Sequence, residues 1–470
     1  MKQKLKNYSG TVILMLVLIH FSSAQSKKLS PNQELARNIF KELIEINTTH
    51  STGNTTVAAL AIRRRFLDAG FPEKDIQITG PETRNRNIIL RYHGTGKRPP
   101  LLLLSHLDVV EARRSDWSMD PFKFTEKDGF FYGRGTSDIK DGSAILVANF
   151  IRLKKEGYVP DRDLILALTA GEEGGVYDGV EWLVNNRRNL IDAAFCINMD
   201  AGDPQLKNGK KMARTVQLSE KSVLNLELEV TNPGGHGSLP VKNNAIYHLA
   251  GGLGKMQAYN FPVQMSEITQ SYFYKMSSFE SGQLSEDMKA IAQSSTDPQV
   301  INRLAISPYY NALMRTTCVA TMLEAGHAIN ALPQSAKAFV NCRILPGNTN
   351  DQIVKEVNEM LNDSQIVIKV IGHPAANPPS PSDPELMKTV EQVTKKLWPG
   401  VPVIAVMDVG ASDGIYLRSA GIPTYGISGV FIDEDENRAH GRDERIGVKE
   451  FYEGVEYEYA LIKAFSSGYK

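Results

Sequence analysis

Short apolar runs alternate with helical patterns in the first half of the chain. Each run is bounded by Gly or polar residues, which is typical of buried parallel strands. The runs lie at residues 87–92, 101–105, 163–169 and 195–197. Residues 31–70 predict two helices, and residues 143–156 predict another. This alternation predicts a mostly parallel sheet with helices on both faces.

The pattern changes near Val216, where residues 224–231 alternate apolar and polar side chains like a half-buried strand. Further strands are expected at residues 316–324, 337–344 and 366–371, with a helix at 350–362. An antiparallel sheet with two helices would form a smaller, inserted α+β domain. Helix and strand alternate again from Pro384, with the clearest strand at residues 403–407.

These changes divide a chain of 470 residues, for which two domains are the default. The fold class is therefore predicted as α/β, with a discontinuous larger domain interrupted by a lid domain. The expected boundaries are a leader at residues 1–24, the first part of the larger domain at 25–215, the lid at 216–375 and the second part at 376–470.

The N-terminus resembles a secretory signal. Lys2, Lys4 and Lys6 precede an apolar run at residues 12–19, and small residues then lead to expected cleavage near Ala24. The run is short for a membrane-spanning helix, although an uncleaved anchor remains an alternative. We expect an exported protein, periplasmic or secreted, with no stable membrane span after cleavage.

The charge balance and the cysteine content limit the possible partners and the expected disulfides. Fifty-three basic and 53 acidic side chains give no net charge, which argues against nucleic acid as a partner. Of three cysteines, Cys196 and Cys342 lie in apolar strand-like runs and are predicted to be buried thiols. Pairing of two of the three stays open, but no disulfide framework is expected.

Five short polar motifs contain residues of the types that bind metal ions. They are SHLDVV with His106 and Asp108, GRGTSDIKDG with Asp138, TAGEEGG with Glu172 and Glu173, NMDAGD with Asp200, and AHGRDERI with His440. Several follow an apolar run, so their polar groups should collect at the carboxyl ends of the strands. Each motif alone could be an ordinary turn or the solvent-exposed face of a helix. Together they indicate a site for two metal ions.

The chemistry of such a site asks for this set of side chains. Two divalent cations about 3.5 to 4 Å apart repel each other, so a carboxylate must bridge them. Each ion needs further nitrogen or oxygen ligands, while space remains for a shared water. One spare carboxylate can then transfer protons.

The five motifs, in this order, resemble the M20 metallopeptidases, a family that includes carboxypeptidases, deacylases and dipeptidases. The resemblance covers nearly the whole chain after the leader. It implies that Asp138 bridges two ions, that Glu173 and His440 bind one, and that His106 and Asp200 bind the other. The ions are expected to be Zn²⁺, with Co²⁺ or Mn²⁺ as alternatives.

The same resemblance implies amide hydrolysis by a hydroxide between the ions. Glu172 would be the general base. Asp108 would lie behind His106 and fix the tautomer of its imidazole, unless it merely ends the strand. His236, in a Gly-rich turn of the lid, would stabilise the oxyanion, often at a neighbouring subunit's site.

Other matched positions concern the substrate. Arg343 resembles an arginine that grips a substrate carboxylate, and Asn330 matches a further carboxylate contact. Gly410 and Ser412 could offer backbone contacts, whereas Asp413 could be a helix N-cap. The expected substrate is thus a small peptide or an N-acyl amino acid with a free carboxylate next to the scissile amide.

Family members also imply a homodimer through the lid domain, but residues 266–316 are longer than in compact members and leave this pairing open. Helices are expected at 283–293 and 296–304 within this stretch. Two alternatives remain at the level of function. One is a two-zinc aminopeptidase, although such enzymes generally lack an inserted lid. The other is a non-catalytic exported binding protein.

Overall fold

The computed structural model describes residues 28–372, 375–433 and 436–467. The expected leader at residues 1–24 lies outside the described residues. Within the described ranges, no helix combines the length and apolar character needed to cross a membrane.

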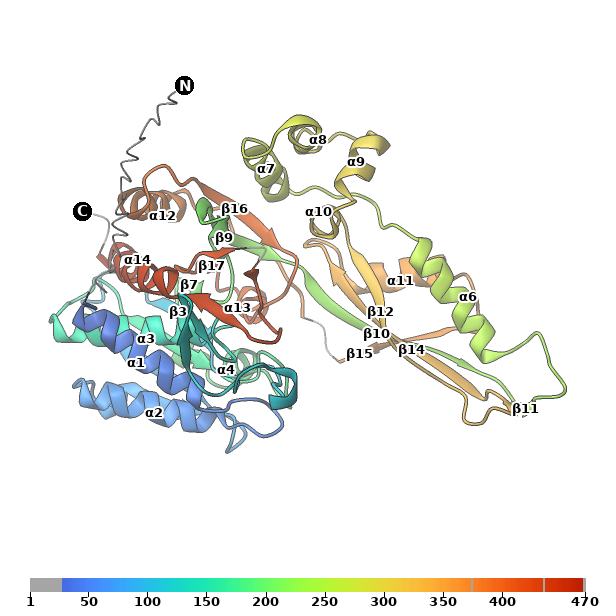
Figure 1. Ribbon diagram of the computed structural model, residues 1–470, viewed down its shortest axis with the longest axis horizontal. Coiled ribbons are helices and arrows are strands. Elements are labelled where there is room, and N and C mark those ends of the chain that lie inside the picture. Colours follow the sequence, from blue (N-terminus) through green and yellow to red (C-terminus); the bar gives the residue numbers. More distant parts are fainter. Residues whose placement is uncertain (1–27, 373–374, 434–435, 468–470) are drawn as a thin grey trace, which may run out of the picture.

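A ten-stranded sheet forms the centre of the larger domain (Figure 1). Its path is β1-β2-β6-β3-β7-β17-β9-β8-β18, and β16 pairs with β9. The strands are β1 (Ile76–Thr79), β2 (Asn87–Tyr92), β3 (Leu101–His106), β6 (Leu164–Thr169), β7 (Phe195–Asn198), β8 (Gln205–Lys207), β9 (Lys210–Glu220), β16 (Val403–Asp408), β17 (Thr424–Gly426) and β18 (Ile432–Asp433). The middle run β6-β3-β7-β17 is parallel, while β1, β2 and β8 run antiparallel to a neighbour.

Helices cover both faces of this sheet, as predicted, because successive side chains of a strand point to opposite sides. Leu101 and Leu103 join the larger apolar core, whereas Leu102 and Leu104 join a second core on the other face. The helices are α1 (Pro31–Glu45), α2 (Thr55–Asp68), α3 (Lys140–Lys155), α4 (Gly179–Asn186), α5 (Arg188–Ile191), α12 (Pro384–Leu397), α13 (Gly414–Ser419) and α14 (Val448–Ser467). The predicted fold class is confirmed.

Helix α3 starts three residues earlier than its apolar pattern predicts. Its first turn carries Lys140, which is polar in sequence and fully buried in the structure. The ammonium group donates hydrogen bonds of 2.9 Å to the carbonyls of Leu43 and Ile46, where α1 ends. A buried charge with backbone partners does not follow the hydrophobic pattern, which explains the shifted boundary.

Smaller elements complete the larger domain. A three-stranded sheet has the order β19-β5-β4. Its strands are β4 (Thr125–Lys127), β5 (Phe130–Tyr132) and β19 (Arg445–Gly447), and two 3₁₀ turns lie at Glu73–Asp75 and Arg114–Asp116.

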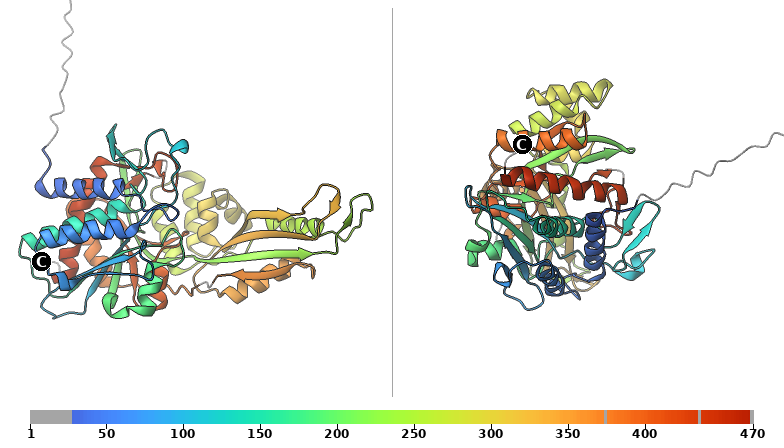
Figure 2. Two further views of the ribbon diagram at one scale, coloured as in Figure 1. Left: turned by 90° about the horizontal axis from the view of Figure 1, so that it is seen from below. Right: turned by 90° about the vertical axis from the view of Figure 1, so that its left-hand side faces the viewer.

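The lid is a four-stranded antiparallel sheet in the order β12-β14-β10-β15, with α6 and α11 packed on one face. Its elements are β10 (Ser222–Thr231), α6 (Ala245–Ala258), β12 (Thr317–Ala325), β14 (Ser335–Ile344), α11 (Asn350–Leu361) and β15 (Val367–Ile371). A short hairpin of β11 (Gly235–His236) and β13 (Ala331–Leu332) forms its tip. The lid extends away from the larger domain (Figures 1 and 2).

One residue, Lys221, separates β9 of the large sheet from β10 of the lid sheet. The expected change of pattern at residue 216 therefore falls near this crossing, and the exact domain boundaries stay a prediction. The Lys221 ammonium is buried and donates a 2.7 Å hydrogen bond to the carbonyl of Arg315. This bond ties the crossing strand to the segment that enters β12.

The stretch between α6 and β12 folds into four helices, which we call the insert. They are α7 (Glu267–Met276), α8 (Gly282–Ala292), α9 (Pro298–Leu304) and α10 (Pro308–Met314), so the two expected helices are present with two more. The insert has its own apolar core, which also contains Ile404 and Val406 of β16. By sequence it belongs to the lid region, but its apolar face packs on the large sheet.

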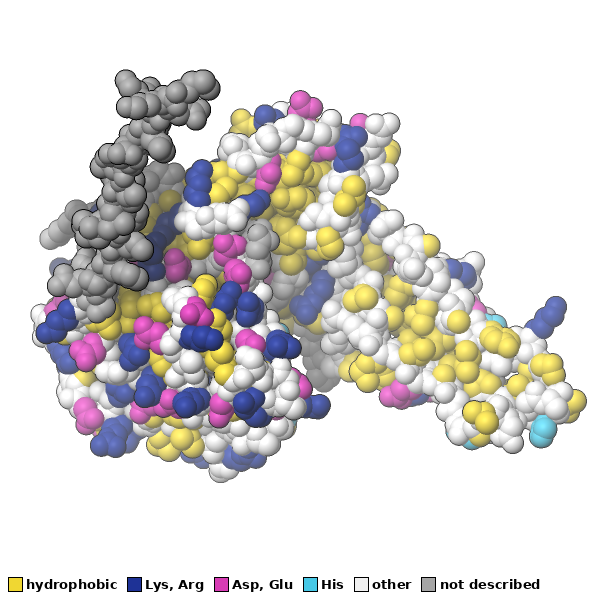
Figure 3. Space-filling view, in the orientation of Figure 1, with side chains coloured by type: hydrophobic (Ala, Val, Ile, Leu, Met, Phe, Trp, Pro, Cys, Tyr) yellow, Lys and Arg dark blue, Asp and Glu magenta, His cyan; other side chains and the backbone are white. Residues whose placement is uncertain are grey.

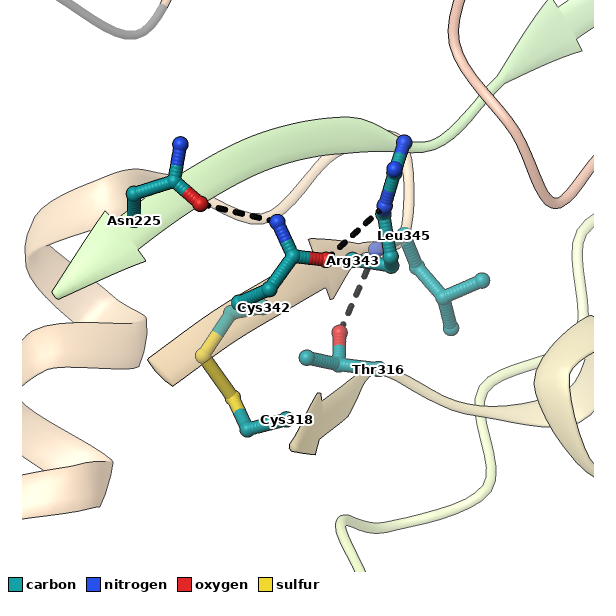
Figure 4. The surroundings of a disulfide bond; sticks show 7 residues. Asn225, Thr316, Cys318, Cys342, Arg343 and Leu345 are labelled. Atoms are coloured by element: carbon teal, nitrogen blue, oxygen red, sulfur yellow. Dashed lines mark hydrogen bonds between the residues drawn. A yellow bond between two sulfur atoms is a disulfide. The ribbon is translucent and has the colours of Figure 1, made fainter. Parts of the chain in front are cut away.

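The cysteine prediction was partly wrong. Cys196 is a buried free thiol, as expected, but Cys342 forms a disulfide with Cys318 (Figure 4). The two residues are direct partners across β12 and β14. The apolar pattern around each cysteine predicts a strand but not its neighbour. The pairing follows only from the register of β12 against β14.

Candidate metal centre

Three adjacent strands bring three of the predicted ligands, together with the predicted general base Glu172, to one edge of the large sheet. β3 ends at His106, and its neighbours β6 and β7 lead into the loops that carry Glu172, Glu173 and Asp200. Parallel neighbours place their carboxyl ends together, which is where open α/β sheets bind ligands. These side chains therefore lie at the edge of the sheet that the sequence predicts.

Asp138 faces both imidazoles from just before α3. Its Oδ1 lies 3.2 Å from His106 Nε2, and its Oδ2 lies 3.0 Å from His440 Nε2. Two oxygens of one carboxylate thus face two different histidines, which is the arrangement that a bridging ligand needs.

The remaining carboxylates divide between the two histidines. Asp200 Oδ1 lies 3.8 Å from His106 Nε2, while Glu173 Oε2 lies 2.9 Å from His440 Nε2. The ligand atoms of His106, Asp138 and Asp200 lie within 4.8 Å of one another, as do those of Asp138, Glu173 and His440. The residues of these two groups are those of the two ligand sets that the family resemblance implies.

A third grouping joins His106 with Glu172 and Glu173. Glu172 Oε2 lies 3.9 Å from His106 Nε2, so it is nearly as close to this nitrogen as Asp200 is. By its distance to His106, Glu172 could therefore be either a metal ligand or the general base.

Charge interactions at the site favour cations. Burial raises the pKa of Asp200 to about 7, and burial together with the charge of Asp200 raises the pKa of Glu172 well above its usual range. Burial also acts to raise the pKa of Asp138, but hydrogen bonds from both imidazoles lower it below its usual range. Hydrogen bonds to Asp138 and Glu173 raise the pKa of His440 to about 10. Positive charge is therefore stabilised where the carboxylates converge.

Asp108 contacts His106 through its backbone. His106 Nδ1 lies 3.0 Å from the carbonyl oxygen of Asp108, whereas the nearest carboxylate oxygen is 3.8 Å away. The carboxylate instead accepts a 3.0 Å hydrogen bond from the backbone N–H of Glu173. A bond to the carbonyl requires Nδ1–H, which leaves Nε2 free to bind a metal.

Glu444 organises the Asp138 loop and has no counterpart in the sequence prediction. Its buried carboxylate accepts hydrogen bonds from the backbone N–H groups of Gly135, Ser137 and Asp138, at 3.1, 2.8 and 3.2 Å. Arg134 forms a 2.6 Å ion pair with the same carboxylate. The sequence offers one indication of this role, because Glu444 lies in the same short motif as His440.

Arg134 also reaches the histidine loop. Its Nη2 donates a 3.3 Å hydrogen bond to the carbonyl of His440. His440 has φ of 62°, in the left-handed region that is uncommon for residues other than Gly. Backbone of this kind persists where its surroundings hold it, and it is often found at functional sites. One ion pair thus connects the loops of Asp138 and His440.

Gly410 and Ser412 line a cavity that Asp200 also lines. The Ser412 side chain is buried and donates a 2.8 Å hydrogen bond to Glu220, so it supports its loop. Asp413 precedes α13 but makes no capping hydrogen bond. Its carboxylate accepts a 2.8 Å hydrogen bond from the Thr169 hydroxyl instead.

Arg343 lies at the end of β14, at the base of the lid. Its Nε donates a 3.1 Å hydrogen bond to the side chain of Asn341, which donates in turn to Asn225 (Figure 4). Burial lowers the pKa of Arg343, and the negative charges of Glu172 and Glu220 partly offset this effect. The guanidinium group is therefore within electrostatic reach of the metal centre.

His236 and Asn330 lie together at the tip of the lid. The N–H of Gly237 donates a 2.8 Å hydrogen bond to the carbonyl of Asn330, and both predicted residues are exposed. The β11 tip is at the end of the lid remote from the larger domain (Figure 1). The structure brings these two residues to each other, but not to the metal centre of the same chain.

Comparisons with known proteins agree with this geometry. Residues 102–464 match the family model for Peptidase family M20/M25/M40. The chain is 28% identical to human N-fatty-acyl-amino acid synthase/hydrolase PM20D1 over 90% of this chain and 86% of that protein. It is 27% identical to a probable carboxypeptidase S-like 2 of Dictyostelium discoideum, over 98% of this chain and 93% of the relative.

Solved structures show the same fold. A metallo-carboxypeptidase of the M20 family from Sulfolobus solfataricus superposes with a TM-score of 0.68 at 17% identity. The superposition covers 92% of this chain and 99% of the archaeal one. At this identity the likeness concerns the fold alone, and it includes the lid.

Proposed function

Because the chain belongs to peptidase family M20/M25/M40, whose members hydrolyse amide bonds, we propose that it cleaves an amide next to a free carboxylate. The substrate would be an N-acyl amino acid or the C-terminal residue of a small peptide. The observation that carries this proposal is Asp138, whose two oxygens face His106 and His440 separately. The names of the two relatives, an N-fatty-acyl-amino acid hydrolase and a carboxypeptidase, agree with it.

The side chains present fit two divalent cations. Imidazole nitrogens and carboxylate oxygens suit Zn²⁺ first, with Co²⁺ and Mn²⁺ as alternatives. Asp138, His106 and Asp200 would hold one ion, and Asp138, Glu173 and His440 the other. When bound, such ions lower the pKa of water toward 7 and polarise a carbonyl group.

Glu172 would move the proton. Its carboxylate takes a proton from the attacking water and later gives it to the nitrogen of the leaving amine. Burial and the charge of Asp200 raise its pKa, which favours the protonated form needed for the second transfer. Asp108 and Glu444 would keep His106 and Asp138 in position through the backbone bonds described above.

A direct test is hydrolysis of N-acetyl amino acids by purified protein loaded with zinc. We expect release of the free amino acid, loss of this activity after chelation, and its return when zinc is added back. An aminopeptidase requires a free α-amino group, so it would cleave unblocked dipeptides and leave the N-blocked ones intact. A binding protein without turnover would release nothing from either set.

Arg343 would grip the substrate carboxylate, since its planar group can bond both oxygens at once. Arg343→Ala should raise KM by roughly 10- to 100-fold, because a bond between charged groups is lost. The control is the same substrate with its carboxylate amidated, on which wild type and variant should be equally poor. A KM that stays unchanged for the free carboxylate would exclude the clamp.

We also propose a homodimer through the lid. β12 is an edge strand, and its side chains Val319, Met322 and Leu323 are each 58–63% exposed. Edge strands with apolar side chains readily pair with another chain. In such a dimer, the remote tip with His236 and Asn330 would reach the partner's metal centre and contact the oxyanion and the carboxylate.

Mixing two inactive variants tests this arrangement. His236→Ala and Glu172→Gln should each be inactive alone, yet co-refolded mixtures should recover about a quarter of wild-type activity. Random pairing makes half of the dimers mixed, and each mixed dimer has one complete site. Sites built within one chain would give no recovery, and size-exclusion chromatography checks that the mixture is dimeric.

We further propose export. The pattern at residues 1–24 supports it, as does the disulfide between Cys318 and Cys342, since disulfides persist in oxidising compartments. N-terminal sequencing of the protein recovered from the periplasm or medium should begin at Gln25. An intact Met1 in the mature protein would contradict cleavage at this point.

A further inference from the structure

A cavity of about 700 Å³ adjoins the metal centre, and both the large sheet and the insert contribute to its walls. Cavities of roughly 300–1,000 Å³ are typical of small-molecule sites. Asp200, a ligand of the proposed metal centre, is one of the lining residues. A group bound in this cavity can therefore belong to the same substrate molecule as the scissile amide.

Carboxylates dominate the charged side chains of this cavity. Lys207 lies 4.0 Å from Glu280, so these two charges balance each other. Glu220 forms an ion pair with Arg418, and Asp200 belongs to the metal-binding groups. The charged lining residues are Asp200, Asp203, Lys207, Glu220, Glu280 and Asp408. Two carboxylates, at positions 203 and 408, are thus left without an ion pair among the described residues.

Asp203 and Asp408 also repel each other. Burial and the charge of Asp408 raise the pKa of Asp203 to about 7. Burial and the charge of Glu220 raise the pKa of Asp408 to about 6. The charges of Arg214 and Arg418 offset these shifts only in part. A cation held near both carboxylates would stabilise their charged forms.

Gln217 adds a hydrogen-bond acceptor to the same cavity. Its side chain lines the cavity and is only 1% exposed. The amide nitrogen Nε2 donates a 2.9 Å hydrogen bond to Glu220, which identifies Oε1 as the acceptor end of the amide. Among the described residues, Oε1 has no hydrogen-bond partner. Buried polar atoms are usually satisfied, so Oε1 indicates a ligand that donates hydrogen bonds.

The insert lines the cavity with aromatic rings. They are Tyr272 of α7, Phe279 in the turn before α8, and Tyr309 and Tyr310 of α10. Hydrophobic side chains gather below the insert on the face that Figure 3 shows. The face of an aromatic ring attracts an ammonium or guanidinium group. The rings and the carboxylates therefore favour the same kind of ligand.

An organic cation suits this cavity better than a bare metal ion. Asp203 and Asp408 occur in none of the groups of three metal-ligand atoms within 4.8 Å that the described residues form. A guanidinium group presents five N–H donors on a plane that can also stack on an aromatic ring. Its carbon chain would lie against the apolar surface of the wall, as long basic side chains commonly do.

We propose that this cavity binds a cationic side chain of the substrate, so that the enzyme prefers amides whose acyl half is a lysine or arginine residue. The inference rests on the proposed amide hydrolysis. Arg343, the residue proposed to bind the substrate carboxylate, does not line the cavity. The acyl half, with its carbonyl group at the metal centre, is then the part that enters it. Asp203, Asp408 and Gln217 would accept hydrogen bonds from its charged end.

The test is hydrolysis of three N-acetyl dipeptides that end in alanine and have arginine, citrulline or glutamate before it, assayed with zinc-loaded enzyme. Citrulline has nearly the shape of arginine but no charge. We expect kcat/KM for the arginine peptide to exceed that for the citrulline peptide roughly 10- to 100-fold, because hydrogen bonds between charged groups are strong. The glutamate peptide should be the poorest substrate. Equal values for arginine and citrulline would overturn the proposal.

A second pair of peptides tests which half of the substrate enters the cavity. N-acetyl-alanyl-arginine and N-acetyl-alanyl-citrulline place the same two side chains on the leaving residue. We expect the preference for arginine to be much smaller in this pair. A larger preference here would assign the cavity to the leaving residue and overturn the assignment to the acyl half.

Variants of the two carboxylates test the cavity itself. The double variant Asp203→Asn, Asp408→Asn should abolish the preference for the arginine peptide over the citrulline peptide. Asp408→Lys should favour the glutamate peptide over the arginine peptide, a reversal that loss of folding would not produce. The matched control is Glu286→Gln, which removes an exposed carboxylate of α8 outside the cavity and should keep the preference. A double variant that still prefers arginine would contradict the proposed contacts.

Failure of the inference differs from failure of the proposed function. If the arginine and citrulline peptides are hydrolysed equally well, only the cation site is wrong. If no peptide is hydrolysed in the presence of zinc, the proposed function is wrong. Calorimetric titration of the Glu172→Gln variant with both peptides reports on the cation site without turnover. The arginine peptide should bind at least tenfold more tightly, and equal affinity would contradict the cation site.

Discussion

Glu172→Gln should reduce kcat by about 10²- to 10⁴-fold while leaving both metal ions bound. The amide of glutamine has nearly the shape of the carboxylate but cannot accept and return a proton. His106, Asp138, Glu173, Asp200 and His440 all remain, so the ligand sets are intact. The measurements are turnover of an N-acyl amino acid and metal content by mass spectrometry after dialysis.

This variant also separates the roles of the two neighbouring glutamates. If Glu172→Gln retained only one ion, Glu172 would be a ligand and the general base would have to be sought elsewhere. Preserved turnover would exclude it as the base. The matched control is Glu181→Gln, which should behave like wild type. Glu181 lies on the adjacent helix α4 and belongs to none of the candidate metal-binding groups found among the described residues.

Asp138→Ala should lose both ions, whereas His440→Ala should lose only one. Asp138 belongs to both ligand sets, so its removal weakens each ion and also leaves the two cations without a shared negative charge. We expect activity to fall at least a thousandfold in Asp138→Ala, since neither ion remains to act as a Lewis acid. Metal content per chain is the decisive measurement.

Folding must be checked because Asp138 accepts hydrogen bonds in a tightly organised loop. Circular dichroism of Asp138→Ala should match that of wild-type protein prepared without metal. Asp68→Ala, at an exposed carboxylate that ends α2, should keep both ions and full activity. One ion retained by Asp138→Ala would show that the carboxylate belongs to a single ion and does not bridge.

Much of the fold could be predicted because the relevant signals are local. The apolar runs before His106 and Glu172 are complete strands in the sequence, and the adjacency of parallel strands brings their loops together. The reversal of pattern near Val216 is likewise visible in a short window. The large sheet, the lid sheet and helices α8 and α9 agree with those signals, whereas α7 and α10 were not predicted.

What the sequence could not supply depends on contacts between distant segments. Glu444 and Arg134 are 310 positions apart. Each lies in a motif that also holds a predicted ligand, but neither motif by itself indicates that the two side chains form a buried pair. The partner of Cys342 depends on the register of β12 against β14. The insert docks on β16 through the apolar faces of several helices. The sequence pattern shows that each helix has an apolar face, but not which strand or helix that face contacts.

The insert has its chain ends in the lid region and its apolar face on the large sheet. A protein trimmed at the two obvious borders of the lid would therefore lose more than an appendage, because Ile404 and Val406 would become exposed to solvent. Bare apolar strands of this kind promote aggregation. A stable truncated protein should keep the four helices and replace only the antiparallel sheet with its two helices by short bridging turns. It would lack Arg343 and His236, so we expect it to fold but not to turn over substrate.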